Sequence, residues 1–455
     1  MKKIFIRTFG CQMNVRDSEF VAGMLLENGF ELVDSVEKAD VVLFNSCSVR
    51  QHAEDRLFSN IGDLARLKKK KRDLVIVRMG CTAQKYKDKA IDRSPLLDIV
   101  CGPGNEADLA GILKDFMENR CAIVAVDKVN EKRPEIFSIY RENDFKAYVS
   151  IGEGCDNYCS YCIVPYVRGK ERSRDAKDVI REVEELAARG FKEVTLLGQN
   201  VNSYGKAVRP SGRQAVNFVK LLERINKING IERIRFMTSH PKDVHTELFK
   251  AMRDLEKVCE HLHLPLQSGS DRILKLMNRG YTAKRYLKLV EDYRKIVCGG
   301  SLTTDIIVGF SSETEADFKK TLSVMRSIEF DSAFTFKYSP RPPAKSAFLK
   351  DDVPAAAKEK RLQSIIGLQV ASSKKRNESL IGSVVEVLVD GRNKKDEKSL
   401  SGRTRTNKAV IFEGDRSLVG SLLNIEIRSA TSFALRGRIE AGSSTFLSPT
   451  RQAVS

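Results

Sequence analysis

Short apolar runs alternate with amphipathic stretches over the first 118 residues. Three runs have the length and flanking turn residues that are typical of buried strands: Lys2–Phe9, Ala39–Phe44 and Leu74–Met79. The other stretches carry apolar residues at helical spacing: Asp17–Asn28, Ala53–Lys68 and Ala107–Glu118. Strands that alternate with helices predict a parallel sheet, so we expect an N-terminal α/β domain over residues 1–118.

The same alternation resumes after residues 119–144, which we interpret as a linker. Helices are expected at Ala176–Ala188 and Phe218–Asn226, and a helical connector at Ala355–Lys375. Strands are expected at Phe145–Ile151, Lys192–Leu197, Ile231–Met237, His261–Leu266, Thr303–Val308 and Phe334–Tyr338. Six β/α units are fewer than the eight of a closed barrel, which favours a partial (β/α)6 barrel over residues 145–375.

Beyond residue 375 the pattern changes to short β-rich runs. These runs are Val384–Val389, Lys408–Phe412, Leu422–Ile427 and Phe433–Arg438. Turn residues at Asp390-Gly391 and Glu413-Gly414-Asp415 separate them. The spacing predicts a small antiparallel β-barrel over residues 376–440, followed by a disordered tail over 441–455.

Composition narrows the class of protein. At roughly 150 residues per domain, the 455 residues indicate about three domains, and a hydrophobic content of 42% is ample for their cores. No apolar run approaches the roughly 18 residues of a membrane helix, and the apolar stretch at the start is too short for a signal peptide. We therefore expect no membrane association and a cytoplasmic location. Ten cysteines in this context favour metal binding over disulfides.

The net charge of +18 indicates a polyanionic partner such as nucleic acid, although solubility alone could account for it. The chain has no tryptophan, so any stacking on bases would rely on tyrosine, phenylalanine and arginine.

Three cysteines share one short loop: Cys155, Cys159 and Cys162, spaced Cys-x3-Cys-x2-Cys. Three thiolates can hold three irons of a cubane cluster, whereas a structural cluster or zinc site normally uses four ligands. Three ligands leave one position open for a substrate or cofactor. A zinc knuckle or buried thiols are the alternatives, and the lack of a fourth Cys or His nearby counts against them.

A second set of three, Cys11, Cys47 and Cys81, is dispersed along the chain. Each follows the carboxyl end of a predicted strand, and these ends share one edge of a parallel sheet. We therefore expect a second three-thiolate site, the alternative being three unrelated small apolar residues. The remaining cysteines have no spaced partner and are interpreted as buried or incidental: Cys101, Cys121, Cys259 and Cys298.

Polar residues end several of the barrel strands and are expected to face the loop cysteines. They are Gln199, Asn200, Ser239, Gln267, Ser268 and Asp305, and each could instead be a cap or turn residue. His261 and His263 lie two residues apart and share one strand face. They could be ligands, but we interpret at least one as a packed, hydrogen-bonded histidine.

The loop from Gly152 to Cys162 resembles the signature of the radical S-adenosylmethionine (SAM) enzymes. In that superfamily SAM chelates the open iron and is cleaved to a 5′-deoxyadenosyl radical, and the aromatic residue at Tyr161 lies against its adenine. Over nearly its whole length the chain resembles the radical-SAM methylthiotransferases, in their N-terminal cluster domain, core and C-terminal TRAM domain. The motifs closest to the MiaB type are Gly10-Cys11-Gln12-Met13-Asn14, Asn45-Ser46-Cys47-Ser48-Val49-Arg50, Ile163-Val164-Pro165-Tyr166-Val167-Arg168-Gly169, Gly198-Gln199-Asn200, Leu264-Pro265-Leu266-Gln267-Ser268-Gly269-Ser270 and Gly402-Arg403-Thr404-Arg405. One departure is Arg341-Pro342-Pro343-Ala344, where the family usually has Gly-Thr after the proline.

The resemblance implies two [4Fe-4S] clusters and two uses of SAM. One SAM would methylate sulfur carried on the auxiliary cluster at Cys11, Cys47 and Cys81, and the other would be cleaved at the second cluster. The product would be 2-methylthio-N6-isopentenyladenosine, next to the anticodon of tRNA. The alternatives are methylthiolation of threonylcarbamoyl-adenosine in tRNA or of a ribosomal protein aspartate, and, in another class, a non-catalytic metal-containing RNA-binding protein.

The resemblance also implies partners and contacts. SAM would contact the strand-end residues Gln199, Asn200, Ser239, Gln267 and Asp305. The tRNA anticodon loop would contact basic residues after the cluster loop and in the small β-barrel: Arg168, Arg172, Arg174, Arg403, Arg405 and Lys408. For Arg168, Arg172 and Arg174 the carboxylate of SAM is the other candidate ligand. Solvated basic surfaces are the alternative for these residues. We expect a monomer served by a low-potential electron donor such as flavodoxin or ferredoxin.

Overall fold

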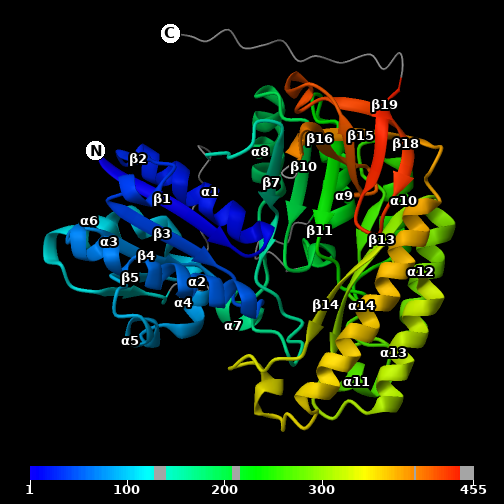
Figure 1. The fold of residues 1–455 in the computed structure, drawn as a ribbon, viewed down its shortest axis with the longest axis horizontal. Helices are drawn as coiled ribbons and strands as arrows, with labels where there is room; N and C mark the ends of the chain where they lie inside the picture. The colour runs from blue at the N-terminus through cyan, green and yellow to red at the C-terminus, as the bar shows by residue number, and fades with distance from the viewer. Residues whose placement is uncertain (128–139, 207–215, 394–395, 441–455) are drawn as a thin grey trace.

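The computed structural model describes residues 1–127, 140–206, 216–393 and 396–440. It consists of an N-terminal α/β unit, a central barrel and a small C-terminal β-barrel (Figure 1). The predicted disordered tail at 441–455 lies outside the described residues. Among the helices that the structure describes, none has both the length and the apolar character needed to cross a membrane.

The N-terminal unit contains a six-stranded, fully parallel sheet in the order β2-β1-β3-β4-β5-β6. Its strands are β1 (Lys2–Phe9), β2 (Phe30–Leu32), β3 (Val41–Ser46), β4 (Val75–Met79), β5 (Ile99–Cys101) and β6 (Ile123–Ala125). The parallel sheet confirms the predicted fold class. However, β6 lies inside the segment expected to be a linker, because that apolar tripeptide pairs with β5.

Helices cover both faces of this sheet. Helices α1 (Gln12–Glu27) and α6 (Leu109–Asn119) pack on one face. Helices α2 (Gln51–Asp63) and α4 (Cys81–Tyr86) pack on the other. The short helices α3 (Ala65–Lys70) and α5 (Lys89–Arg93) complete the unit. Because β3 and β4 are buried on both sides, they read as continuous apolar runs rather than alternating ones.

Six parallel strands form the central barrel, as predicted. They are β7 (Lys146–Ser150), β10 (Glu193–Leu197), β11 (Arg233–Met237), β12 (His261–His263), β13 (Ser301–Val308) and β14 (Ser332–Lys337). Hydrogen bonding divides them into two three-stranded sheets, β11-β10-β7 and β12-β13-β14. The sheets meet where Ile234 bridges Val258, next to the junction of β11 with β12.

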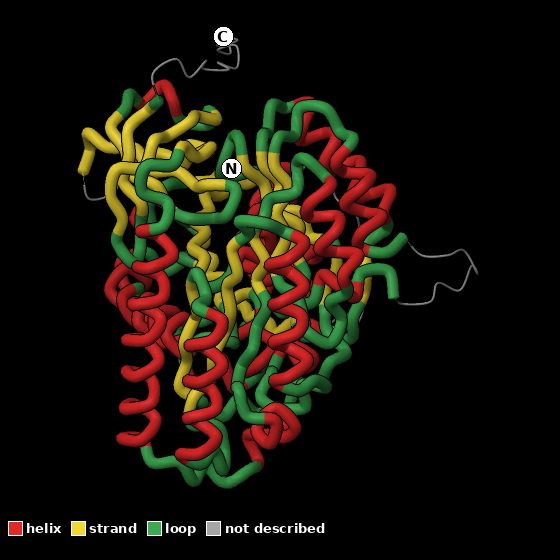
Figure 2. Tube along the Cα trace, turned by 90° about the vertical axis from the view of Figure 1, so that its right-hand side faces the viewer, coloured by secondary structure: helices red, strands yellow, loops and turns green. Residues whose placement is uncertain are grey.

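Helices pack on the outside of the barrel, and Figure 2 shows those on one side of it. They are α8 (Ala176–Ala188), α9 (Phe218–Asn226), α10 (Thr246–Asp254), α11 (Asp271–Leu276), α12 (Ala283–Ile296) and α13 (Glu315–Ile328). Their apolar faces and the strands form one large core. The long helix α14 (Ala355–Glu378) then leads to the C-terminal barrel.

The C-terminal unit is a closed five-stranded barrel in the order β15-β16-β17-β19-β18. Its strands are β15 (Val384–Asn393), β16 (Asp396–Thr404), β17 (Ala409–Glu413), β18 (Leu422–Ala430) and β19 (Leu435–Ile439). Four of the pairings are antiparallel, but β17 and β19 are parallel. The expected turn at Asp390-Gly391 is wrong, because β15 continues through it with a register shift.

Ion pairs hold the C-terminal barrel against the amino-terminal ends of the central strands. Arg405 bonds Glu260 at 2.7 Å, and the fully buried Arg233 bonds Glu386 at 2.7 Å. A second set joins the N-terminal unit to the core, where Arg141 bonds Glu19 at 2.8 Å. The three units are therefore joined by specific polar contacts, which fix the relative positions of their functional residues.

Candidate active site at the strand ends

The register of the N-terminal sheet brings Cys11, Cys47 and Cys81 to one edge. Phe9 pairs with Ser46 and Asn45 pairs with Met79, so β1, β3 and β4 end level with one another. Each cysteine then lies one or two residues past its strand. This placement follows the prediction made from the strand ends.

Glycine and buried asparagines make this close approach possible. A Cβ on Gly10 would lie 2.6 Å from the Cβ of Cys47, so no larger residue fits there. Asn14 donates to the side chain of Asn45 at 3.0 Å, and Asn45 donates to the carbonyl of Asn14 at 2.8 Å. These bonds tie the start of α1, and with it Cys11, to the end of β3.

The three thiols influence one another electrostatically. A hydrogen bond with Cys47, aided by the charge of Arg168, lowers the pKa of Cys11 to about 6. The same hydrogen bond, together with burial, raises the pKa of Cys47. Burial also raises the pKa of Cys81, although Arg168 opposes the effect. The thiolate is the metal-binding form of cysteine, and at Cys11 it is favoured by the adjacent thiol of Cys47 and the guanidinium of Arg168.

The loop set, Cys155, Cys159 and Cys162, lies between β8 (Gly152–Glu153) and α7 (Val164–Arg168). Backbone bonds shape the loop: the amide of Cys162 donates to the carbonyl of Cys159 at 2.9 Å, and that of Cys155 to Gly169 at 3.3 Å. Burial is the main cause that raises the pKa of Cys155 to about 11 and that of Cys162 to about 12. The neighbouring thiols add to both shifts.

In each cysteine set, one sulfur accepts a hydrogen bond from an arginine, and the two arginines differ. The Nη1 of Arg279 lies 3.3 Å from the sulfur of Cys159, and the Nε of Arg168 lies 3.2 Å from that of Cys81. Both arginines are buried, at 4% exposed. Hydrogen bonds to cluster sulfurs and their ligands are a principal means by which proteins tune iron–sulfur sites.

The strand ends beside the loop set carry polar atoms without partners. Among the described residues, buried side-chain oxygens of Gln199, Asn200, Ser239 and Gln267 accept no hydrogen bond. Each such atom costs about 1–3 kcal/mol unless a ligand satisfies it. The predicted SAM-contacting residues therefore provide an edge that fits a polar cofactor. Asp305 also reaches this region and lies 3.5 Å from His263.

Tyr161, the predicted adenine contact, packs beside Met277, Phe310 and Tyr338. Burial raises the pKa of its hydroxyl well above the ordinary value, so the ring stays neutral. Within the described ranges, no three His, Cys, Asp or Glu side chains converge as the ligands of a single metal ion do. A four-iron cubane spaces its thiolates more widely than one ion spaces its ligands, so this absence does not bear on a cluster at either cysteine set.

The two barrel histidines are packed and hydrogen-bonded, as interpreted from the sequence. Both bond the hydroxyl of Thr303 at 3.0 Å, His261 through Nε2 and His263 through Nδ1. Burial lowers the pKa of His261 well below its ordinary value, which keeps the ring neutral.

The structure gives four of the predicted RNA-contacting residues partners within the protein, and one of the four is buried. Arg168 is buried and bonded to Asp17, so its guanidinium is out of reach of an RNA phosphate. Arg174 bonds Glu182 at 2.6 Å, Arg405 bonds Glu260, and Lys408 bonds Asp331 at 2.6 Å, each holding parts of the protein together.

Arg403 and Arg172 retain some exposure. Arg403 is about half exposed and lies 4.0 Å from Asp390. Arg172 is a quarter exposed and lies 3.7 Å from Glu153. Of these two, Arg403 lines the large cavity described next, as Lys408 also does.

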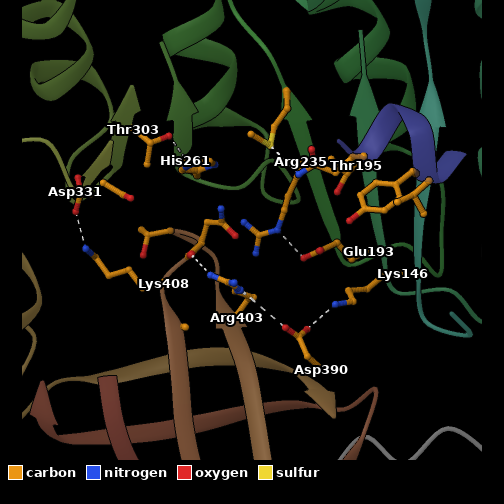
Figure 3. A pocket seen from close by; sticks show the side chains of 18 of the residues that line it. Lys146, Glu193, Thr195, Arg235, His261, Thr303, Asp331, Asp390, Arg403 and Lys408 are labelled. Carbon is orange, nitrogen blue, oxygen red and sulfur yellow. Dashed lines mark hydrogen bonds and ion pairs between the residues drawn. The ribbon is translucent and has the colours of Figure 1, made fainter. Parts of the chain in front are cut away.

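A cavity of about 820 Å³ runs from the C-terminal barrel into the interior of the central barrel. Figure 3 shows side chains from both barrels pointing into it, with ion pairs across and along its wall. Arg235 bonds Glu193 at 2.7 Å, and Lys146 bonds Asp390 at 2.7 Å. At its other limit the cavity is lined by Gln12, the residue next to Cys11.

Three family models match the chain. Residues 3–102 match the "Uncharacterized protein family UPF0004", residues 149–325 the "Radical SAM superfamily", and residues 378–439 the "TRAM domain". Among curated proteins, the tRNA-2-methylthio-N(6)-dimethylallyladenosine synthase of Moorella thermoacetica is 45% identical over 97% of this chain and 99% of its own. The proteins of the same name from Clostridium novyi (46% identical, 96% of each chain) and Caldicellulosiruptor saccharolyticus (47%, covering 96% and 92%) are similar over comparable lengths.

The chain belongs to this synthase family. The radical SAM match within it implies SAM and a [4Fe-4S] cluster.

Solved structures support the fold of these synthases in this chain. The radical SAM methyltransferase TsrM from Kitasatospora setae, with tryptophan and a SAM analog bound, superposes with a TM-score of 0.54. The overlap covers 76% of this chain and 75% of that one, at 13% identity. At that identity the likeness shows shared architecture alone.

Several residues that shape the site of this synthase family member were not found from the sequence. Arg279 lies 120 positions from Cys159, and Arg235 lies 42 positions from Glu193. No local spacing marks such pairs. For Arg235 a signal existed, because a charged residue stands within an apolar strand, where a charge requires a buried partner.

Proposed function

We propose that this chain adds a methylthio group to C2 of N6-dimethylallyladenosine beside the anticodon of tRNA, using two SAM molecules and a sulfur carried at Cys11, Cys47 and Cys81. One observation supports the proposal: Cys81 of the sheet set packs against the segment that follows the loop set. Cys81 packs with Ile163, which directly follows Cys162, and with Val167 on α7. Two sites that exchange groups on one substrate need this proximity.

Each cysteine set would hold one [4Fe-4S] cluster through three thiolates, with one iron left without a protein ligand. With SAM bound, the cluster at Cys155, Cys159 and Cys162 supplies the radical chemistry that activates an unreactive C–H bond. The protein's own contribution is positional. The strand-end oxygens of Gln199 and Gln267 would accept hydrogen bonds from SAM, and Tyr161 would lie along its adenine.

We assign the cavity to the substrate nucleotide. Its volume of about 820 Å³ suits a ligand of nucleotide size. A base within a folded RNA loop must leave its stack before chemistry on its ring. Phe433, which is 81% exposed at the cavity wall, offers a face for stacking, and Arg403 offers a charge for phosphate.

The alternatives differ in substrate rather than chemistry. Methylthiolation of threonylcarbamoyl-adenosine or of a ribosomal protein aspartate would use the same two cysteine sets. The printed names of relatives 45–47% identical over nearly the whole chain favour dimethylallyladenosine. A non-catalytic RNA-binding protein would have no use for unpartnered oxygens facing a three-cysteine loop.

The proposal includes the protein's context. We place the domains at 1–118, 145–375 and 376–440, although β6 belongs with the first sheet. A monomer that works in the cytoplasm with a low-potential flavodoxin or ferredoxin as donor completes the proposal.

Nucleoside mass spectrometry tests the proposed substrate. The chain is expressed in a bacterial strain that lacks its own methylthiotransferases, and digested tRNA and ribosomal proteins are analysed. We expect 2-methylthio-N6-dimethylallyladenosine with the parent chain and its absence with Cys155→Ala. A methylthio group on threonylcarbamoyl-adenosine or on a ribosomal aspartate instead would overturn the substrate assignment.

A further inference from the structure

A buried charge lies where α7, which follows the loop set, meets Cys81 of the sheet set. Arg168 is the last residue of α7, six positions after Cys162, and it reaches into the N-terminal unit. Its Nε donates to the sulfur of Cys81 at 3.2 Å, and its Nη2 donates to Asp17 at 2.5 Å. Asp17 is 1% exposed and Cys81 is 5% exposed, so water screens these interactions little.

The guanidinium cannot be explained as an ion pair alone. An arginine that only linked two domains would commonly donate two parallel N–H bonds to the carboxylate, as a bidentate ion pair. In Arg168 the Nε–H points to a cysteine sulfur instead. Among the described residues, its buried Nη1 has no acceptor. An arginine is always protonated, so this corner of the site carries a permanent positive charge.

We propose that Arg168 is a positioning residue for the auxiliary cluster, holding Cys81 through its Nε–H and raising the cluster's reduction potential through its charge. The inference rests on the proposed function, since it assumes a cluster at Cys11, Cys47 and Cys81. A hydrogen bond to a ligand sulfur and a nearby positive charge both stabilise the reduced, more negative cluster. Asp17 opposes this effect, because its carboxylate lies next to the same guanidinium.

Two substitutions separate this role from a structural one. Arg168→Gln removes the positive charge, and Asp17→Asn removes the negative one, yet both break the same ion pair between units. If the pair only docks the units, both variants weaken the same contact, and any change in potential has the same sign. If the charges act on the cluster, Arg168→Gln shifts the potential to more negative values and Asp17→Asn to less negative values.

The measurement uses the full chain in a background with Cys155, Cys159 and Cys162 all replaced by alanine, so that only the auxiliary cluster assembles. Anaerobically reconstituted protein is titrated redox-potentiometrically and followed by electron paramagnetic resonance, without SAM or tRNA. Arg168→Lys keeps the charge and loses the planar donor fork, so its potential should lie between those of the parent and Arg168→Gln. Arg120→Gln is the matched control, because it removes one positive charge from a half-exposed site that pairs with Asp73.

Shifts of opposite sign for Arg168→Gln and Asp17→Asn, with Arg120→Gln unchanged, support the proposal. Equal potentials in all variants, or shifts of the same sign, overturn it. If Arg168→Gln assembles no cluster, Asp17→Asn decides alone, since an unchanged potential there also overturns the role. A parent background that binds no cluster at these cysteines would instead overturn the proposed function, so the two failures are distinguishable.

Discussion

The two cysteine sets reach similar arrangements by different routes. Cys155, Cys159 and Cys162 lie within eight residues of one another on a single loop. Cys11, Cys47 and Cys81 come from three strand ends, and only the register of a parallel sheet brings them together. The loop set is therefore specified locally, whereas the sheet set depends on the correct fold of a whole unit. The two sets should differ in how they fail.

The largest expected difference separates their chemical roles. Cys155→Ala should abolish the formation of 5′-deoxyadenosine, because SAM cleavage needs the loop set. Cys47→Ala should retain SAM cleavage and lose methylthiolated product, because the proposed function assigns the carried sulfur, and not SAM cleavage, to its site. Anaerobic assays with tRNA, analysed by liquid chromatography and mass spectrometry, measure both products. Methylthiolated tRNA from the Cys47 variant would contradict the two-site assignment.

Two glycine substitutions should each disrupt one of the two cysteine sets through a steric clash alone. In Gly10→Ala the new methyl group would lie 2.6 Å from the Cβ of Cys47, and in Gly154→Ala it would lie 2.1 Å from the carbonyl oxygen of Lys170. Each variant should retain about four of about eight irons per chain, Gly10→Ala losing the sheet cluster and Gly154→Ala the loop cluster.

Iron and sulfide analysis counts the clusters, and SAM cleavage identifies which one remains. Gly111→Ala is the control, since its Cβ meets nothing within 4 Å. It should keep all the iron and gain up to about 1 kcal/mol of stability, because alanine favours the helix. Full iron content in Gly10→Ala would contradict the close approach at that edge.

The junction between the N-terminal unit and the core should depend on pH. Burial raises the pKa of Glu182, but Arg16, Arg174 and Arg141 outweigh it and lower that pKa to about 2. A depressed carboxyl pKa stabilises the folded chain above its ordinary value of 4.5, and this contribution is lost as the pH falls toward 2.

Glu182→Gln should therefore cost about 3 kcal/mol at neutral pH, as expected for breaking a buried charge network. The difference in stability between parent and variant should shrink between pH 4.5 and 2. Chemical denaturation at a series of pH values measures it. A difference that does not vary with pH would rule out a charged Glu182.

The smallest effect on stability is expected where the C-terminal barrel meets the amino-terminal ends of the central barrel's strands. Arg405 and Glu260 are each about a quarter exposed, so their bond should contribute no more than about 1 kcal/mol. A double-mutant cycle with Arg405→Ala and Glu260→Ala measures the coupling. Neither change should alter cluster content, because both residues lie away from the cysteine sets, and a loss of iron would contradict that separation.

The contrast between local and long-range specification also explains which features the sequence could predict. The loop set and the six barrel strands follow from spacing and hydrophobic pattern, and the sheet set follows from strand ends. By contrast, β16 was not found from the sequence, because its charged residues mask the apolar pattern of a strand. Only closure of the barrel stabilises this strand. The RNA contact predicted for Arg168 does not fit its burial, and Arg405 pairs with Glu260, since a positive charge in the sequence does not reveal the acid that meets it in the fold.

The parallel pairing of β17 with β19 has a consequence for the chain as a polymer. It is the pairing that closes the C-terminal ring, and β19 also bonds β18 on its other side. Translation stopping before Leu435 would leave two strands with bare amide edges, which readily recruit strands from other molecules. Premature termination here should therefore produce insoluble aggregates rather than a shortened but dispersed enzyme.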